Sequence, residues 1–402
     1  MIPPLLEGLA EHLASWGLRR FESDQEYFRW QRETISAADL AQLTELAQRK
    51  SVHADLASEV AFYDFSVQPA VLPTLYSQRY DYYAAVAPLV AARIGAAQTV
   101  LDVGCGPGIL TTFYAEQSPH IQFVGIDRSA ASIATARERA GKLGLKNVRF
   151  ECADVDVAMP AGFYDVIVAT HAVLQSESDP GIPSTGWQTF ERAHHGGLQA
   201  EFERRTGLGV RLDRLCAAMA PAGRFLVFEK TRQLSRRVPF QRAFAARECA
   251  PLEAPIPIRY TVVEETADDG PFYVLGRAPA AGASRVEWDE TPELEGPIDI
   301  DFARLGLSGG SGEEPLYENH SASAQTVWAQ LPDRIIIKET TCRGIDGKQL
   351  HVERGEAQGV SYLYCANTFD QRQVVLVSHD QARQLDEYYE EIRSGTEDRM
   401  AK

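Results

Sequence analysis

A glycine-rich stretch followed by an acid is the part of the sequence with the clearest chemistry. Gly104, Gly106 and Gly108 alternate with other residues at the end of an apolar run that starts at Val100. Without Cβ atoms, glycines let a backbone turn sharply and approach a ligand closely. Asp127 stands 19 residues after Gly108, at the end of the next apolar run. A carboxylate at this place can accept both hydroxyls of a ribose, so the pattern predicts a nucleoside-binding loop.

Three details of this stretch separate it from a dinucleotide-binding dehydrogenase loop. Asp102 lies two residues before the first glycine, within the end of the predicted strand. The glycine spacing is G-x-G-x-G, whereas the dinucleotide fingerprint is G-x-G-x-x-G. A further acid, Asp154, follows the third predicted strand. These differences favour a different nucleoside cofactor.

The elements around the loop alternate between strand and helix. Apolar runs predict strands over 99–103, 122–126, 148–152, 164–169 and 224–228, with helices over about 109–116, 129–144 and 208–219. This order predicts a parallel sheet covered on both faces. Two more strands, over 259–263 and 272–275, are expected to form an antiparallel pair around an acidic turn at 268–270.

Residues 98–230 resemble the class I S-adenosylmethionine-dependent methyltransferases. The similar segments are VLDVGCGPG (100–108), VGIDRS (124–129), ECADV (151–155), FYDVIVATHAVLQ (163–175) and LCAAMAPAGRFLVFEK (215–230). The resemblance implies an α/β fold with a Rossmann-like, doubly wound, mostly parallel seven-stranded sheet over about 98–278. It also implies S-adenosyl-L-methionine as the cofactor.

The resemblance further implies which residues contact the cofactor. Asp127 is expected to bind the ribose hydroxyls, Asp154 the adenine amino group and Asp102 the methionine amino group. Arg79, at the start of the helix before the sheet, is expected to reach the methionine carboxylate. The full expected set is Arg79, Asp102, Gly104, Cys105, Gly106, Gly108, Asp127, Arg128, Asp154, Val155, Thr170 and His171. No H-E-x-x-H or comparable spacing is present, so no metal ligands are expected.

His171 is the first candidate for a general base. It follows the fourth predicted strand, where the family meets both methyl donor and acceptor, and a neutral imidazole can take a proton at pH 7. A neutral histidine that contacts the cofactor or packs under the sheet rim is the alternative. The Asn-Pro-Pro-Tyr common at this point is replaced by Thr170-His-Ala-Val. Its absence disfavours methylation of base or glutamine amino groups.

His194 and His195, in an insertion over 176–207, are second candidates for contact with the acceptor. A surface loop is the alternative. Because neighbouring residues of a helix do not face the same side, a metal-binding pair is disfavoured.

The remaining length is expected to form three further parts. Residues 1–97 are predicted to be helical, with an aromatic stretch over 62–76 that is either a packed connector or a substrate lid. Residues 279–312 are expected to be an acidic linker, in which 298–302 could pair as an edge strand. Residues 313–402 are predicted to form a small α+β module, for dimerisation, active-site cover or carrier-protein recognition. The sequence leaves open whether the protein forms a homodimer.

The charge and composition limit the classes of molecule that the protein is expected to bind. A formal charge of −16 on 402 residues disfavours a broad grip on nucleic acid. One basic cluster, Arg232, Arg236, Arg237 and Arg242, is expected on a solvated helix. The six scattered cysteines, the lack of a secretory start and the lack of a membrane-spanning run predict a cytoplasmic protein without membrane partners.

The leading hypothesis is methyl transfer to an oxygen or nitrogen of a small molecule, in specialised or amino-acid-related metabolism. Methylation of protein or RNA is a second hypothesis. A cofactor-binding scaffold with an interaction role is a third.

Overall fold

The computed structural model describes residues 4–53, 55–174, 179–194, 196–277, 286–307, 315–344 and 347–400. The chain divides into two compact units. The first unit comprises Met1–Asp179, Ala200–Arg232 and Phe240–Trp288, and the second comprises Pro180–Gln199, Gln233–Pro239 and Asp289–Lys402.

The first unit is built on an eight-stranded sheet in the order β3-β2-β1-β4-β5-β8-β6, with β7 paired to β8. Its strands are β1 (Thr99–Val103), β2 (Gln122–Asp127), β3 (Val148–Cys152), β4 (Tyr164–Thr170), β5 (Met219–Phe228), β6 (Cys249–Pro251), β7 (Ile256–Val262) and β8 (Glu265–Arg277). Strands β1 to β5 run parallel, and β8 is antiparallel to β5, β6 and β7. The doubly wound, mostly parallel sheet is therefore confirmed, with β6 as an additional short strand.

The central strands form because short apolar runs are buried on both faces of the sheet. Val100 and Leu101 of β1 and Ile167 of β4 have no exposed surface. Such continuous burial is typical of parallel strands covered by helices. The order of the strands reverses between β1 and β4, so their carboxyl ends diverge there and leave room for a ligand.

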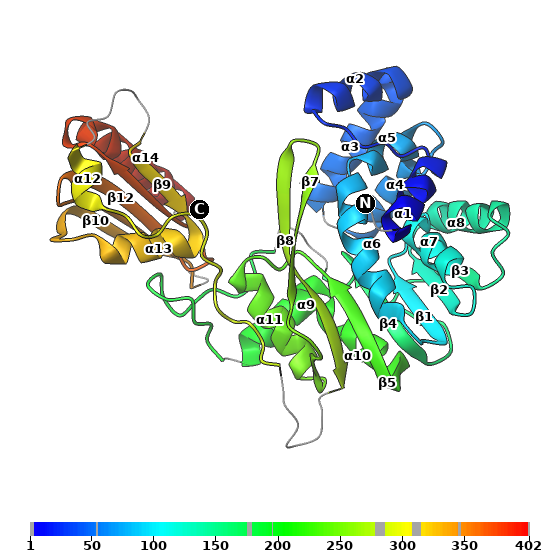
Figure 1. Ribbon diagram of the computed structural model, residues 1–402. Helices are drawn as coiled ribbons and strands as arrows, with labels where there is room; N and C mark the ends of the chain where they lie inside the picture. The colour runs from blue at the N-terminus through cyan, green and yellow to red at the C-terminus, as the bar shows by residue number, and fades with distance from the viewer. Residues whose placement is uncertain are drawn as a thin grey trace. The chain divides into compact units, whose positions relative to one another are not determined.

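Helices precede and alternate with these strands. They are α1 (Pro4–Ser15), α2 (Asp24–Thr34), α3 (Ala37–His53), α4 (Leu56–Ser66), α5 (Val71–Ser77), α6 (Tyr80–Ile94), α7 (Ile109–Gln117), α8 (Ala130–Lys142), α9 (Gly196–Thr206), α10 (Leu208–Ala218) and α11 (Leu234–Ala245). The predicted helical start of the chain is confirmed, and the aromatic stretch 62–76 falls largely within α4 and α5. Figure 1 shows α2 to α5 grouped together at one end of the first unit.

The N-terminal helices join the core of the sheet unit. Leu13 of α1 and Val86 and Val90 of α6 are fully buried in one apolar cluster with Val100 of β1. Each such buried side chain contributes about 1.5–3 kcal/mol relative to exposure. Ser129 begins α8 because its Oγ accepts the backbone N–H of Ser132 at 3.0 Å, an N-cap that ends the loop after β2.

The second unit is a five-stranded antiparallel sheet in the order β10-β11-β12-β13-β9, which confirms the predicted α+β module. Its elements are α12 (Phe302–Leu307), β9 (Tyr317–His320), α13 (Ser321–Gln330), β10 (Ile335–Arg343), β11 (Gln349–Ala357), β12 (Val360–Asn367), β13 (Arg372–Val377), η1 (His379–Gln381) and α14 (Ala382–Met400). Alternate residues of the strands form two apolar clusters, one with α13 and one with α14. This is the two-residue periodicity expected of strands covered on both faces.

Three expectations about these elements are wrong. Residues 268–270 do not form a turn: they lie within β8, and the chain turns at Val263 and Glu264, where Val263 has φ +57°. Residues 298–302 form no strand, because Ile298 and Ile300 pack on the second unit's apolar core and Phe302 begins α12.

The third error concerns the basic cluster, which is not on a solvated helix. Arg236 and Arg237 are only 6% and 2% exposed. A buried guanidinium needs acceptors, and Nη2 of Arg237 donates to the carbonyl oxygen of Thr291 at 2.6 Å.

None of the helices in the described ranges combines the length and apolar character needed to cross a membrane.

Candidate active site

A cavity of about 430 Å³ lies in the first unit where the strand order reverses. The carboxyl ends of β1, β2 and β4 supply one wall, and residues from α3, α4, α5 and the start of α6 supply the other. Its volume is within the range of small-molecule sites. The cavity is therefore the candidate active site, because it gathers polar groups at the place where open α/β sheets bind ligands.

The loop between β1 and α7 forms the floor of the cavity and requires glycine at two places. Gly104 has φ +68°, and a Cβ built there would lie 2.7 Å from Cβ of Ala172 in the loop after β4. Gly108 has φ +80°, and its Cβ would lie 2.9 Å from Cβ of Ala136 on α8. Gly104 thus keeps two loops close together, whereas Gly108 supports the packing of α7 against α8.

Asp127 at the end of β2 is held across this loop. Its Oδ2 accepts the N–H of Gly106 at 2.9 Å, and its Oδ1 accepts the N–H of Ser129 at 2.8 Å. Burial raises the pKa of Asp127, and these two donors oppose that rise. The carboxylate is therefore fixed in position at the cavity wall before any ligand arrives.

Asp102 is a second acid in the cavity, and few groups stabilise its charged form. It is 6% exposed, and Oγ1 of Thr111 donates to its Oδ2 at 2.5 Å. Burial raises its pKa to about 7, and the nearby charge of Asp127 adds to the rise. Among the described residues no cation pairs with Asp102. A positively charged ligand group would supply the missing partner.

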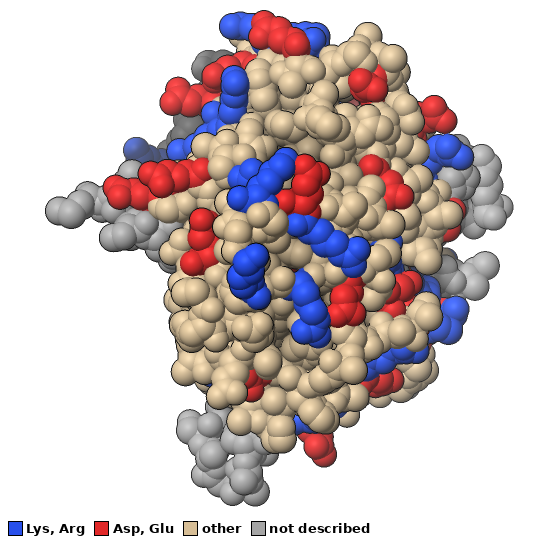
Figure 2. All heavy atoms as spheres, turned by 90° about the vertical axis from the view of Figure 1, so that its right-hand side faces the viewer, with Lys and Arg blue, Asp and Glu red and all other residues tan. Residues whose placement is uncertain are grey.

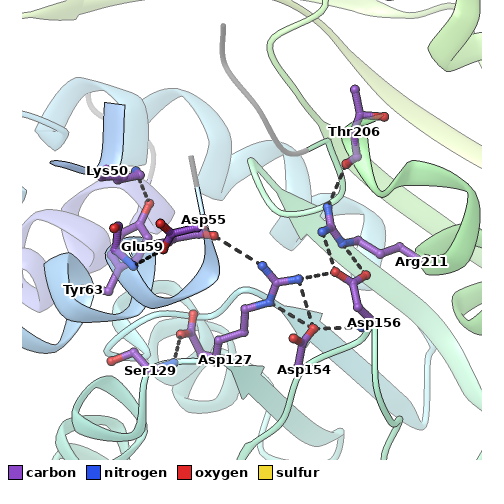
Figure 3. Close-up of polar contacts among 12 residues, drawn as sticks. Lys50, Asp55, Glu59, Tyr63, Asp127, Ser129, Asp154, Asp156, Thr206 and Arg211 are labelled. Atoms are coloured by element: carbon purple, nitrogen blue, oxygen red, sulfur yellow. Dashed lines mark hydrogen bonds and ion pairs between the residues drawn. The ribbon is translucent and has the colours of Figure 1, made fainter. Parts of the chain in front are cut away.

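Two arginines and three acids form a charge network along one side of the cavity (Figure 3). Nε of Arg128 donates to Asp154 at 3.0 Å, Nη2 to Asp156 at 2.6 Å and Nη1 to Glu59 of α4 at 3.3 Å. Arg211 of α10 binds both carboxylate oxygens of Asp156, at 2.8 and 2.7 Å. The network joins α4, the ends of β2 and β3, and α10.

His171 directly follows the carboxyl end of β4 and has an unusual backbone conformation. Its φ is +55°, and its N–H donates to the carbonyl oxygen of Phe228 at 2.8 Å. The ring packs beside those of Tyr82 and Phe228, at centroid distances of 5.3 and 5.1 Å, and these two rings also contact each other. Nε2 is 3.2 Å from Oδ2 of Asp269. Burial lowers the pKa of His171 while Asp269 opposes that effect, so the imidazole is neutral at neutral pH.

Glu229, which the sequence did not single out, holds the loop that carries His171. It is 2% exposed, and its Oε1 accepts the N–H groups of Ala172 and Val173 at 2.7 and 2.6 Å. Burial raises its pKa to about 7. Its only sequence signal is a position directly after an apolar strand.

The helical wall of the cavity is aromatic and basic. Nζ of Lys50 donates to the hydroxyl of Tyr63 at 3.0 Å, and Tyr76 and Tyr83 line the same wall. The guanidinium of Arg79 lies 5.6 Å from the ring centre of Tyr82 and is accessible from the cavity. Spacing in the sequence gives no signal for Lys50, whereas the tyrosines belong to the aromatic stretch and to the start of α6.

Most residues expected to contact the cofactor come together around the cavity. Those that line it are Arg79, Asp102, Gly104, Cys105, Gly106, Asp127, Arg128, Val155, Thr170 and His171. Gly108 and Asp154 are not among the lining residues, and the carboxylate of Asp154 is bound by Arg128. His194 is exposed and belongs to the second unit, and His195 lies outside the described residues.

A separate polar cluster occurs in the second unit. Ligand atoms of Glu339, His351 and Glu353 lie within 4.8 Å of one another. Glu353, however, already accepts hydrogen bonds from Trp328 at 3.0 Å and Tyr362 at 2.6 Å. The absence of a metal from this protein stays a prediction.

Comparison with known proteins finds similarity to methyltransferases over part of the chain. Residues 94–232 match the family model described as a methyltransferase domain. A trans-aconitate 2-methyltransferase of Variovorax paradoxus (strain S110) is 33% identical over 155 residues, which are 37% of this chain and 56% of that protein. A malonyl-[acyl-carrier protein] O-methyltransferase of Paenibacillus sp. (strain JDR-2) is 36% identical over 84 residues, 20% and 30% of the two chains.

Among solved structures, a mitomycin 7-O-methyltransferase aligns with a TM-score of 0.39 and 17% identity, over 60% of this chain and 67% of that one. The chain spans little more than half the length of the first curated relatives it matches. Residues 94–232 are thus a methyltransferase domain, homologous to class I S-adenosylmethionine-dependent methyltransferases.

Proposed function

We propose that this protein transfers a methyl group from S-adenosylmethionine to an oxygen or nitrogen of a small molecule, in specialised or amino-acid-related metabolism. The observation that carries the proposal is the single cavity wall on which Asp102, the glycine loop, Asp127 and His171 meet. The cofactor supplies an electrophilic methyl group on a positively charged sulfur.

The residues present fit this cofactor by charge. The methionine end of the cofactor carries an ammonium and a carboxylate. The cavity offers an unpaired carboxylate and a positively charged guanidinium. Asp102 lacks a cation, and among the described residues no carboxylate pairs with Arg79. Asp102 would bind the ammonium and Arg79 the carboxylate, while Asp127 would bind the ribose hydroxyls.

The chain's own contribution to methyl transfer is positioning and exclusion of water. Four tyrosine rings on the helical wall of the cavity can hold an acceptor near the carboxyl end of β4. They are those of Tyr63, Tyr76, Tyr82 and Tyr83. Bringing reacting atoms to about 3–3.5 Å in line can supply about 7–11 kcal/mol of the barrier. His171, neutral and next to this space, is the candidate group for accepting a proton.

Two observations favour a small acceptor. The relatives whose names are given above act on trans-aconitate and on malonyl-[acyl-carrier protein]. On the face shown in Figure 2, basic and acidic side chains are interspersed and form no continuous basic stripe of the kind that a nucleic-acid backbone requires. Methylation of protein or RNA is thus the weaker alternative.

The test is a transfer assay with methyl-labelled S-adenosylmethionine and a cell extract separated into metabolite, protein and RNA fractions. At a limiting concentration of S-adenosylmethionine, we expect label in the metabolite fraction with the wild-type protein and several-fold less with Asp127→Asn. Asp165→Asn is the matched control, because Asp165 also accepts backbone N–H groups, at 2.8 and 3.0 Å, but lies at the opposite end of β4. Label found only in protein or RNA, or in no fraction, would overturn the proposal.

A further inference from the structure

We propose that Cys216 of α10 and Cys249 of β6 are a redox modification site, at which a small peroxide converts two thiols into a disulfide. The disulfide joins the end of α10 to the short strand at one edge of the sheet and so stabilises the fold. This inference goes beyond the proposed function and does not depend on it.

The first support is the contact between the two sulfur atoms. Sγ of Cys216 lies 3.9 Å from Sγ of Cys249, although the two residues are 33 positions apart in the chain. Both side chains are free thiols. A disulfide bond is about 2.05 Å long, so the sulfur atoms have to approach each other by about 2 Å. Rotation of the two side chains about their Cα–Cβ bonds would supply this approach.

The second support is that other contacts hold the two backbone segments together. Nε of Arg247, two residues before Cys249, donates to Asp213 of α10 at 2.7 Å. Arg277, at the end of β8, pairs with Cys249 in the sheet, and its Nη2 donates to the carbonyl oxygen of Cys216 at 3.1 Å. The two thiols are therefore held side by side by groups that a change at sulfur leaves in place.

The third support is the difference in charge between the two thiols. The hydrogen bond between them lowers the pKa of Cys249 and raises that of Cys216. Burial raises both pKa values, whereas the guanidinium groups of Arg247 and Arg277 lower both, and Glu248 raises that of Cys249. Because the thiolate is the reactive form of cysteine, Cys249 is expected to react first.

Burial restricts the oxidant to a small molecule. Cys216 and Cys249 are 7% and 2% exposed, so the disulfide of another protein cannot approach their sulfur atoms. Hydrogen peroxide is small enough, and it converts a thiolate into a sulfenic acid that a neighbouring thiol can condense with.

The reaction balances with one peroxide molecule. The Cys249 thiolate attacks one peroxide oxygen, so an S–O bond forms, the O–O bond breaks and the leaving oxygen takes up a proton as water. Cys216 then loses its proton and its sulfur attacks that of Cys249. The S–S bond forms, the S–O bond breaks, and the leaving hydroxide takes up a proton as the second water. Two electrons thus pass from the two sulfur atoms to the peroxide.

The pair lies away from the cavity. Cys216 comes shortly before the start of β5 at Met219, and Cys249 pairs with Arg277, the last residue of β8. Since β8 is antiparallel to β5, both thiols are near the amino end of β5. The cavity lies at the carboxyl ends of the parallel strands. Stability, and not methyl transfer, is therefore the direct readout of oxidation at this site.

The first experiment maps the thiols of the full-length wild-type protein after treatment with hydrogen peroxide. Remaining thiols are blocked, and the peptides are identified by mass spectrometry without reduction. We expect a peptide pair linked through Cys216 and Cys249, lighter by two hydrogen atoms than the two free peptides and separated by dithiothreitol.

Cys152 is the internal control of this experiment. It is exposed, and among the described residues no cysteine lies in contact with it, so peroxide should oxidise it to a sulfenic or sulfinic acid. The proposal is overturned if Cys216 and Cys249 stay thiols at a peroxide concentration that oxidises Cys152. Oxidation of Cys249 to a sulfinic acid without a link to Cys216 overturns it as well.

The second experiment compares thermal unfolding before and after the peroxide treatment. A cross-link restricts the unfolded chain, so the midpoint temperature of the wild-type protein should rise by about 5–10 °C. The rise should be absent in Cys249→Ala and unchanged in Cys152→Ala, the matched control. No rise in the wild type, or an equal rise in Cys249→Ala, would contradict a stabilising cross-link. Because the mapping uses the wild-type protein, its result does not depend on how well a variant folds.

Discussion

Replacing Gly104 by alanine tests the close approach on which the cavity floor depends. The backbone at Gly104 has φ +68°, where an L-residue costs about 1–2 kcal/mol. The new Cβ would also lie 2.7 Å from Cβ of Ala172, and such overpacking costs about 1–3 kcal/mol. The free energy of unfolding should therefore fall by about 2–5 kcal/mol in urea unfolding, and affinity for S-adenosylmethionine should fall with it.

Two other glycines separate the backbone cost from the steric one. Gly144 also has φ +68° but has no atom within 4 Å of a built Cβ, so Gly144→Ala should cost only the backbone share. Gly141 lies in α8 with open space around it, and Gly141→Ala should stabilise by about 0.5–1 kcal/mol. Ala172→Gly should restore the steric share in Gly104→Ala. If Gly104→Ala costs no more than Gly144→Ala, or if Ala172→Gly restores nothing, the inferred loop contact is wrong.

Two further predictions concern buried charges near the cavity. The pKa of Glu229 is about 7 in the fold against 4.5 ordinarily, so the folded state holds a proton that the unfolded chain releases. Its contribution to stability is complete below about pH 4.5 and is lost as the pH rises to 7, by up to about 3 kcal/mol. Glu229→Gln should remove this loss, and urea unfolding at pH 5 and 7 measures it; an unchanged pH difference would contradict the assignment. Arg211→Met should destabilise by about 3 kcal/mol, because Arg211 is 1% exposed and binds Asp156 and the carbonyl oxygen of Val173. Arg214→Met, with a partner only at the surface, should change the free energy of unfolding by less than about 0.5 kcal/mol, and equal effects would refute the distinction.

The glycine loop and its acids were predictable because they depend on local rules. A buried strand, a turn that needs positive φ and a helix follow one another within a few residues, and Asp127 ends the next strand. Parallel strands place their carboxyl ends at one edge, so Asp102, Gly104 and His171 had to lie near each other once the sheet formed.

The residues that hold His171 were not predictable in the same way. Asp268-Asp-Gly270 has the composition of a turn, but the ladder of β7 and β8 continues through it, with Asp269 as the extra residue of a β-bulge. Glu229 carries no motif, and its role depends on a loop nearly 60 residues earlier in the chain. Long-range contacts of this kind leave no periodic signal in the sequence.

The burial of charged side chains is not predictable from the sequence for a related reason. Arg236 and Arg237 were expected on a solvated surface because charged residues are rarely buried. A guanidinium can be buried where carbonyl oxygens converge on it, as that of Thr291 does on Arg237. Only the tertiary structure shows where such acceptors converge.

Calorimetric titration with S-adenosylmethionine tests the central claim most directly. The account predicts one binding site per chain and at least about tenfold weaker binding in Asp127→Asn, since each hydrogen bond to a charged group contributes about 1.5–3 kcal/mol. Asp165→Asn should bind as the wild type does. No binding by the wild-type protein, or equal affinity in Asp127→Asn, would contradict the assignment of this cavity.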